Sequence, residues 1–275
     1  MPSDADRALA RLYDLDLSVD PGDLDLYLAL AARADGPVVE LAAGTGRIAV
    51  PLAEAGHDVT GIDIDAAMLE RAEARASVQA LAGGAARAKG PTARSGAGTL
   101  RLLERDLFAS PGDLAGTFRL AILALNSILL LGGHRDQRRA IAAMAALVEP
   151  GGLVVVDTWQ PVAEDLVRFD GRLSLEWLRR DPDTGRDVAK LAAAWYDGAT
   201  RAVTLTTIFD EASPGDAPIR WTRSDALHLV SAGELRSHAE DTGLEVEFIG
   251  GDYGLSPLAA GDERAILVAR RPTRD

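Results

Sequence analysis

The sequence predicts an α/β fold with a doubly wound, mostly parallel sheet of seven strands and an antiparallel β insertion after the fifth strand. Three observations support this prediction. Short apolar segments alternate with helical patterns between residues 36 and 158. A turn of small residues, 42–46, follows the first apolar segment. The alternation stops at Trp159 and resumes near residue 228, which indicates an insertion.

The composition limits the possible functions. Of the 275 residues, 47% are hydrophobic, so the chain can bury a sizeable core. The formal net charge of −13 repels phosphate backbones and anionic membranes, so we expect a small-molecule substrate and neither nucleic acid nor a membrane as partner. The absence of cysteine excludes disulfides and thiolate nucleophiles. No spacing suggests a metal site, and the acidic amino terminus is unlike a signal peptide, so we expect a metal-free cytoplasmic protein.

Residues 1–35 are predicted to form an amino-terminal helical segment. Apolar residues recur at helical spacing up to Tyr13. Pro21-Gly22-Asp23 then interrupts the pattern, and a second helix is expected at about 24–33.

The strand–turn–helix–strand unit that follows organises the chain. An apolar strand at 38–41 ends in the small-residue turn, and a second strand at about 58–62 ends in Asp63. Gly44 and Gly46 carry no Cβ, so their backbone can adopt a positive φ and approach a ligand closely. The N–H groups at the start of the next helix point at that ligand, and Asp63 can accept hydrogen bonds from both hydroxyls of a ribose. The unit therefore predicts a nucleoside site at the carboxyl ends of the strands.

Two cofactors compete for this unit. Residues 44–49 read G-x-G-x-x-A, which is the dinucleotide fingerprint. However, an acid, Glu40, precedes the turn, and a dinucleotide site does not need it. A nicotinamide-dependent oxidoreductase would also need a donor set such as Tyr-x-x-x-Lys, which the sequence lacks.

Five more strands complete the predicted sheet. They are expected at about 99–104, 120–125, 153–157, 244–249 and 265–269. The loop before the first of them, 77–98, is basic and low in complexity, which predicts a surface insertion. Asp106 and Asn126 close two of these strands, and Ser231 to Glu234 form a capping box ahead of the last helix.

Residues 40–46 resemble the first motif of class I S-adenosylmethionine-dependent methyltransferases, acid-x-G-x-G-x-G, with Ala42 in place of the first glycine. The turn 149–152, Glu-Pro-Gly-Gly, resembles the loop that precedes strand five in the same family. The resemblance covers residues 36–158 and 228–271. It implies a Rossmann-like cofactor-binding domain at 36–158 and 228–275, with S-adenosylmethionine as cofactor and S-adenosylhomocysteine as product.

The resemblance also implies roles for single residues. Glu40 would lie near the methionine part of the cofactor, Asp63 would bind the ribose, and Asp106 would bind the adenine amino group. An alternative for Asp106 is that it caps the next turn. The complete set of implied cofactor-binding residues is Glu40, Ala42, Gly44, Gly46, Asp63, Ile64, Met68, Asp106, Leu107, Leu125 and Asn126.

Residues 159–227 are predicted to form an antiparallel insertion of about four strands. All four tryptophans lie here, and Asp197-Gly198 is a strong hairpin signal. The insertion is similar in style to substrate-capping segments of sugar and metabolite methyltransferases, and Trp159, which directly follows the end of the fifth strand, is expected to line the substrate pocket. The alternatives are that the tryptophans fill a satellite core or bury a homodimer interface between edge strands.

Tyr13-Asp14 resembles the aromatic-acid pair that some small-molecule methyltransferases place over the cofactor, which implies that residues 1–35 form an amino-terminal helical lid and that Tyr13 contacts the substrate. Ser127 follows Asn126 where the fourth motif of the family faces the substrate, which implies a substrate contact there too.

The expected reaction is methyl transfer from S-adenosylmethionine to a nitrogen or oxygen of a small molecule by in-line displacement. Positioning supplies much of the rate in such a reaction. No general base stands out, and the candidates are His228 and Tyr13. The absence of a clear base favours an amine acceptor or catalysis by proximity. The alternatives are a nicotinamide-dependent oxidoreductase and a non-catalytic cofactor-binding scaffold.

Overall fold

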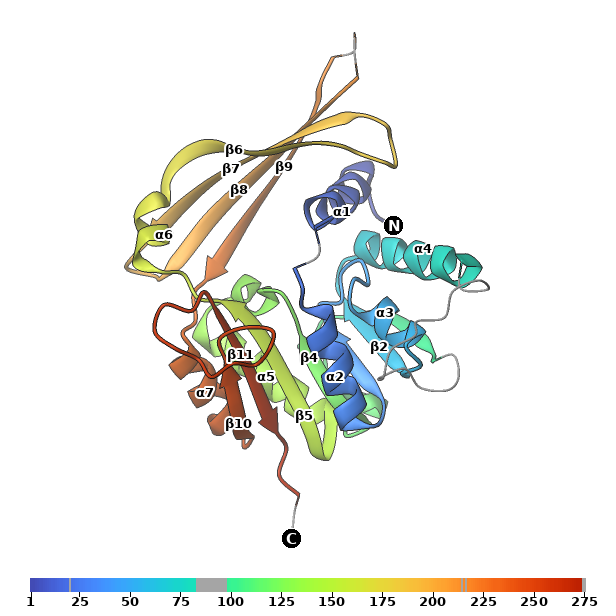
Figure 1. Cartoon of the computed structure of the whole chain (residues 1–275), viewed down its shortest axis with the longest axis vertical. Helices are drawn as coiled ribbons and strands as arrows, with labels where there is room; N and C mark the ends of the chain where they lie inside the picture. Colours follow the sequence, from blue (N-terminus) through green and yellow to red (C-terminus); the bar gives the residue numbers. More distant parts are fainter. Residues whose placement is uncertain (20, 83–97, 214, 216, 274–275) are drawn as a thin grey trace. The chain divides into compact units, whose positions relative to one another are not determined.

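The computed structural model describes residues 1–19, 21–82, 98–213, 215 and 217–273. The chain forms two compact units (Figure 1). We call Met1–Asp20 with Pro161–Leu229 the antiparallel unit, and Pro21–Gln160 with Val230–Asp275 the parallel unit. Among the described helices, none has the length and apolar character that crossing a membrane requires. Most of the surface loop expected at 77–98 lies outside the described residues.

The parallel unit is built on a seven-stranded sheet in the order β10-β11-β5-β4-β1-β2-β3. Its strands are β1 (Val38–Leu41), β2 (Val59–Asp63), β3 (Leu100–Glu104), β4 (Phe118–Leu123), β5 (Val148–Trp159), β10 (Glu245–Gly250) and β11 (Arg264–Arg270). β1 to β5 pair in parallel, and β11 runs antiparallel to both β5 and β10. The doubly wound, mostly parallel sheet is therefore confirmed. The strand order reverses beside β1, where such sheets bind ligands at their carboxyl ends.

Helices cover this sheet. They are α2 (Leu24–Ala34), α3 (Ala49–Glu54), α4 (Ala66–Ala82), α5 (His134–Leu147) and α7 (Ala232–Asp241), with short 3-10 turns η1 (Gly112–Leu114) and η2 (Ser127–Leu130). α3 contacts α2 and α4, whereas α5 contacts α7 (Figure 1). Ser231 and Glu234 form the predicted capping box of α7. The surface loop begins later than residue 77, because the helix-favouring residues at the end of α4 continue the helix to Ala82.

The main hydrophobic core lies in the parallel unit. It joins α2, the central strands and β11 through Tyr27, Leu120, Ile122, Val155 and Ile266, each 0% exposed. Because β4 and β5 are covered on both faces, their sequences are nearly continuous apolar runs rather than alternating ones. This core fixes the strand ends from which the site is built.

The antiparallel unit contains the predicted four-stranded insertion. Its elements are α1 (Asp4–Asp16), α6 (Ala163–Arg168), β6 (Asp170–Arg180), β7 (Asp187–Asp197), β8 (Ala202–Ala212) and β9 (Ile219–His228). The strands form an antiparallel sheet in the order β6-β7-β8-β9. Leu12 and Leu15 of α1 pack against Val188 and Phe209 of this sheet.

The two helices of the expected amino-terminal segment, 1–35, fall into different units. α1 belongs with the insertion because its apolar stripe packs on the antiparallel sheet and because Arg11 pairs with the buried carboxylates of Asp181 and Glu211. α2 belongs with the parallel sheet, where Tyr27 and Leu30 are buried. An amphipathic pattern predicts a helix but does not say which apolar surface the helix will cover.

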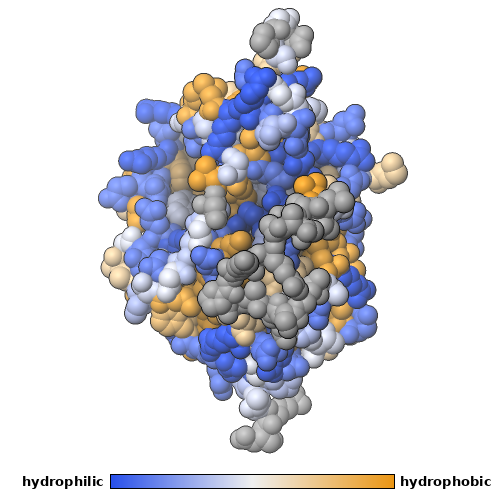
Figure 2. All heavy atoms as spheres, turned by 45° about the vertical axis from the view of Figure 1, so that its right-hand side comes forward, coloured by the Kyte–Doolittle hydropathy of each residue, from blue (hydrophilic) through white to orange (hydrophobic). Residues whose placement is uncertain are grey.

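The face shown in Figure 2 is largely hydrophilic. Hydrophobic residues lie on it in small groups between hydrophilic ones. Small groups of hydrophobic residues of this kind are normal on the surface of a globular protein.

Candidate functional site

The glycine-containing turn after β1 requires left-handed backbone at three positions. Ala42, Gly44 and Gly46 have φ values of 52°, 54° and 72°. A Cβ on Gly46 would lie 2.9 Å from Val50 Cγ2 and 3.0 Å from Ala72 Cβ, so this glycine also permits close packing of α3 and α4. A Cβ on Gly44 would meet no atom within 4 Å. Gly44 therefore faces open space, as a backbone that approaches a ligand must.

Ala42→Gly should stabilise the protein by up to about 1 kcal/mol, because an L-residue in the left-handed region costs about 1–2 kcal/mol and the greater freedom of glycine in the unfolded chain offsets only part of it. Urea denaturation measures the difference. Ala43→Gly is the matched control: Ala43 is buried and not left-handed, so the same change should destabilise by about 1 kcal/mol. A less stable Ala42→Gly variant would contradict this account of the turn.

Glu40 lies on β1 with 3% of its surface exposed. Its Oε2 has no hydrogen-bond partner among the described residues. Burial raises the pKa of Glu40 to about 8, with a small further increase from Asp63 and Asp23, while Arg47 acts in the opposite direction. A buried oxygen without a partner is costly, so Glu40 fits a site in which a bound ligand supplies the missing donor.

Asp63 joins the end of β2 to the glycine-containing turn. Its Oδ2 accepts a hydrogen bond from Gly44 N at 2.7 Å, and its Oδ1 accepts one from Asp65 N at 2.9 Å. Burial raises the pKa of Asp63 although these two hydrogen bonds oppose the shift. Each carboxylate oxygen has two lone pairs, so Asp63 keeps acceptor capacity for a ribose.

The residues after Asp63 differ in exposure. Ile64 is 70% exposed, whereas Met68 is buried on the first turn of α4. Asp65 caps that helix, since its Oδ1 accepts hydrogen bonds from Ala67 N at 2.8 Å and Met68 N at 3.3 Å. An exposed isoleucine beside the carboxyl end of β2 is available to a ligand.

A shallow hollow, open to solvent, lies beside the loop after β3. It is lined by Leu41, Ile62, Arg105, Asp106, Leu107, Ala109, Pro111, Leu114, Ala143 and Leu147. Asp106 Oδ1 accepts a hydrogen bond from Phe108 N at 2.8 Å, so this acid does cap the next turn. The cap uses one oxygen only, and the exposed carboxylate can still accept hydrogen bonds from a ligand.

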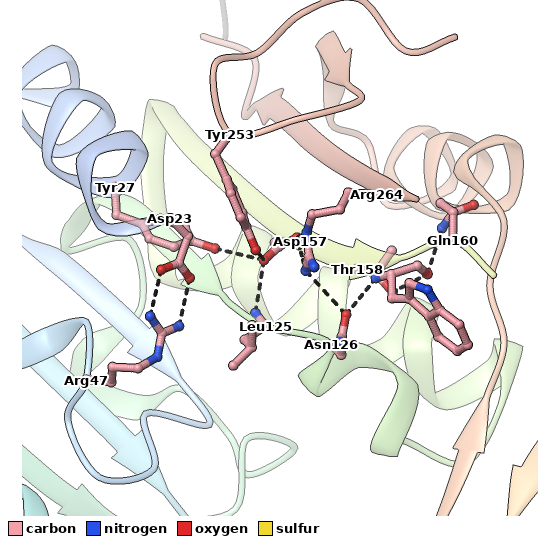
Figure 3. A network of polar contacts seen from close by, with 11 residues as sticks. Asp23, Tyr27, Arg47, Leu125, Asn126, Asp157, Thr158, Gln160, Tyr253 and Arg264 are labelled. Carbon is pink, nitrogen blue, oxygen red and sulfur yellow. Dashed lines mark hydrogen bonds and ion pairs between the residues drawn. The ribbon is translucent and has the colours of Figure 1, made fainter. Parts of the chain in front are cut away.

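Two residues follow β4 in an unusual conformation. Leu125 and Asn126 have φ values of 46° and 65°. Leu125 N donates to Asp157 Oδ2 at 3.2 Å, and Asn126 Oδ1 accepts a hydrogen bond from Trp159 N at 2.6 Å (Figure 3). The end of β5 therefore holds both residues of this turn.

Asp157 is the centre of a buried polar network that the sequence analysis did not identify (Figure 3). It is 0% exposed, and its Oδ1 accepts hydrogen bonds from Arg264 Nε at 2.9 Å and Nη2 at 2.7 Å. The hydroxyls of Tyr253 and Tyr27 lie 3.4 and 3.5 Å from Oδ2. Burial raises the pKa of Asp157, and the Arg264 guanidinium opposes that shift. The only sequence signal was an acid at the end of an apolar run.

A second buried ion pair lies close to this network (Figure 3). Asp23, which is 0% exposed, accepts hydrogen bonds from Arg47 Nη1 at 2.6 Å and Nη2 at 2.7 Å. The pair joins the start of α2 to the residue that follows Gly46. It too was absent from the sequence predictions, because the two partners lie on different elements.

Comparison with known proteins identifies the family. A family model described as a methyltransferase domain matches residues 13–247, which is most of the chain. The chain belongs to this family. It is a class I S-adenosylmethionine-dependent methyltransferase, as the first motif implied, and S-adenosylmethionine is its cofactor.

The similarity to known relatives covers different shares of this methyltransferase. The cypemycin N-terminal methyltransferase of a Streptomyces species is 24% identical and matches 98% of each chain. The dTDP-3-amino-3,4,6-trideoxy-alpha-D-glucopyranose N,N-dimethyltransferase of Streptomyces venezuelae is 28% identical over 50% of this chain and 55% of its own. The crystal structure of an S-adenosylmethionine-dependent methyltransferase from Clostridium acetobutylicum is 15% identical and has a TM-score of 0.74, with 97% of this chain and 98% of its own covered. The last similarity shows the fold.

The expected residues of the methyltransferase site divide between the two units. All the expected cofactor-binding residues, together with Ser127 and Trp159, belong to the parallel unit. Tyr13, on α1, and His228, at the end of β9, belong to the antiparallel unit. The catalytic roles of Tyr13 and His228, and the substrate-binding roles of Tyr13, Ser127 and Trp159, stay predictions.

The tryptophans of the insertion do not share one environment. Trp177 and Trp221 pack on the small core between α1 and the antiparallel sheet, as the satellite-core alternative proposed. Trp177 Nε1 donates to Asp16 at 2.9 Å, and Trp221 Nε1 donates to Glu211. Trp195 is 58% exposed. At least two of the four tryptophans thus stabilise the antiparallel unit itself.

Proposed function

We propose that this methyltransferase transfers the methyl group to a nitrogen atom of a small-molecule acceptor, mainly by positioning. The observation that carries the proposal is the relative that matches 98% of each chain, which is named for methylation of an amino terminus. A second relative is named as an N,N-dimethyltransferase of an amino sugar nucleotide. Both names describe nitrogen acceptors.

The parallel unit offers groups for each part of the cofactor. Asp63 would accept hydrogen bonds from the ribose hydroxyls, and Asp106 and Leu107, beside the shallow hollow after β3, would contact the adenine ring. Glu40 Oε2 and the turn Leu125–Asn126 would contact the methionine part, where Glu40 would gain the donor it lacks. The remaining contacts are proposed for Ala42, Gly44, Gly46, Ile64 and Met68.

The cofactor, when bound, supplies an electrophilic methyl group on a sulfonium. The chain then needs to hold a neutral amine about 3–3.5 Å from that carbon and in line with the leaving sulfur. A neutral amine brings its own lone pair, so no residue must remove a proton before transfer. We propose Ser127, which directly follows the turn Leu125–Asn126, and Trp159, the last residue of β5, as acceptor contacts, with Tyr13 and His228 as further candidates.

A panel of matched acceptors tests the nitrogen assignment. The protein is incubated with methyl-labelled S-adenosylmethionine and with amino sugar nucleotides, peptides with free amino termini, and the same compounds with hydroxyl in place of the amine. We expect label on the amines and none on the hydroxyl analogues. Methylation of hydroxyl compounds alone would overturn the nitrogen assignment. Tight cofactor binding without label on any acceptor would instead favour the non-catalytic scaffold.

We also propose that the protein forms a homodimer through β6. This edge strand exposes Leu173, Leu175 and Leu178 by 54%, 58% and 71%. Exposed apolar edge strands favour pairing with another chain. Sedimentation equilibrium should give a dimer for the wild type and a monomer for Leu175→Glu, whereas Thr204→Glu on the internal strand β8, also exposed, is the control. A monomeric wild type would refute the dimer.

A further inference from the structure

The turn after β4 carries more backbone strain than its sequence explains. Leu125 and Asn126 are consecutive non-glycine residues in the left-handed region, at φ values of 46° and 65°. Asparagine tolerates this conformation, but leucine does so only when its surroundings impose it. The contacts that hold Leu125 are therefore the ones to identify.

Three hydrogen bonds join the turn to the end of β5. Leu125 N donates to Asp157 Oδ2 at 3.2 Å, and Asn126 N donates to the Asp157 carbonyl at 3.2 Å. Trp159 N donates to Asn126 Oδ1 at 2.6 Å. The bond to Leu125 depends on one carboxylate oxygen of Asp157, so the turn depends on what keeps that carboxylate ionised and oriented.

Arg264 is the group that does this. Its Nε and Nη2 both donate to Asp157 Oδ1, at 2.9 and 2.7 Å, which leaves Oδ2 directed at Leu125 N (Figure 3). The same Nη2 lies 3.4 Å from Asn126 Oδ1. The Arg264 guanidinium therefore contacts both the carboxylate that holds Leu125 and the side chain of Asn126. The planar fork of arginine makes this possible, and the compact ammonium of lysine cannot reproduce it.

The sheet and a tyrosine fix the place of Arg264. It is the first residue of β11, and in the antiparallel pairing with β5 it lies opposite Trp159. Its guanidinium lies 4.9 Å from the centre of the Tyr253 ring, and 22% of its side chain is exposed. The register of two neighbouring strands thus brings a cation to the buried acid beside the turn.

We propose that Arg264 is a positioning residue, which acts through Asp157 and Asn126 to hold the turn Leu125–Asn126 in the conformation that binds the cofactor. The inference rests on the proposed function, in which this turn contacts the methionine part of S-adenosylmethionine. Without the Arg264 cation, the fully buried Asp157 carboxylate takes up a proton. A protonated Asp157 is a weaker hydrogen-bond acceptor for Leu125 N, and the turn Leu125–Asn126 then relaxes from its left-handed conformation.

Calorimetry with S-adenosylmethionine tests this role. We expect Arg264→Gln to bind the cofactor at least 10-fold more weakly and Arg264→Lys about 3- to 10-fold more weakly. The control is Arg270→Gln at the other end of β11, which removes bonds to Glu247 Oε1 and to the Gly151 carbonyl, both at 2.5 Å, and should stay within 2-fold of wild type. In kinetics, the KM for the cofactor should rise in the Arg264 variants, while kcat at saturating cofactor falls less than 3-fold.

A purely structural role for Arg264 would lower the melting temperature and leave cofactor affinity unchanged, and that result would overturn the proposal. A loss of cofactor affinity in Arg270→Gln as large as that in Arg264→Gln would also overturn the proposal. If Arg264→Gln does not fold, Arg264→Lys decides, because wild-type affinity in that variant contradicts a need for the fork. A wild type that binds S-adenosylmethionine but methylates no amine refutes the proposed function alone, and the affinity comparison still stands. A wild type that does not bind the cofactor refutes both.

Discussion

Asp23→Ala should lower the free energy of unfolding by about 3–5 kcal/mol, because it removes one partner of a buried ion pair. Asp23 is 0% exposed and accepts two hydrogen bonds, at 2.6 and 2.7 Å, from the Arg47 guanidinium. The variant leaves that cation in the interior without its carboxylate. Urea denaturation followed by circular dichroism measures the loss.

Two controls make this result specific. Asp25→Ala changes an exposed acid on the same helix and should alter stability by less than about 0.5 kcal/mol. The double variant Asp23→Leu with Arg47→Met removes both charges and should recover most of the loss, because apolar replacement of a buried pair is often neutral. A loss below about 1 kcal/mol in Asp23→Ala would show that Arg47 is well solvated without Asp23.

Glu40→Gln should stabilise the cofactor-free protein by about 2–4 kcal/mol at pH 8 and by almost nothing at pH 4.5. The pKa of Glu40 rises from 4.5 in the unfolded chain to about 8 in the native state, chiefly because of burial. Between these values the native state binds more protons than the unfolded state, so the contribution of Glu40 to stability decreases as the pH rises. Below pH 4.5 both states are protonated, and the difference disappears.

The measurement is a series of urea titrations from pH 4.5 to pH 8.5 on wild type and variant. Glu104→Gln, at an exposed position, is the control and should show no such dependence on pH. The same Glu40→Gln variant should bind S-adenosylmethionine more weakly, because it loses the carboxylate proposed to contact the cofactor. A variant that loses stability toward pH 8 would contradict a protonated, buried Glu40.

The parallel sheet could be predicted from the sequence because its signals are local. The apolar runs that became β1, β2, β4 and β5 are followed by turns or acids, and these signals located all four strands. The boundaries were less accurate, since β4 ends at Leu123 and not at residue 125, and β5 extends from Val148 to Trp159, beyond the predicted 153–157 at both ends. The N-caps at Asp65 and Ser231 also depend on residues within three positions of one another. The left-handed turn at Gly44 and Gly46 follows from the same kind of short-range rule.

The buried polar network could not be predicted, because it depends on contacts between residues far apart in the chain. Asp157 meets Arg264 only through the register of β5 and β11, and it meets Tyr27 only through the packing of α2. Each of these residues alone has an ordinary local explanation. The packing of α1 with the insertion could not be predicted for a similar reason, since Arg11 pairs with Asp181 and Glu211, which are far away in the sequence.

The association of α1 with the insertion affects any attempt to transfer the antiparallel unit to another protein by building chimeras. A graft of residues 161–229 alone would leave the antiparallel sheet without its own α1, so Val188 and Phe209 would lose the cover that Leu12 and Leu15 give them in this chain. It would also leave the buried acids Asp181 and Glu211 facing a helix that does not carry Arg11. The transplantable module is therefore discontinuous, and its first piece is the amino terminus.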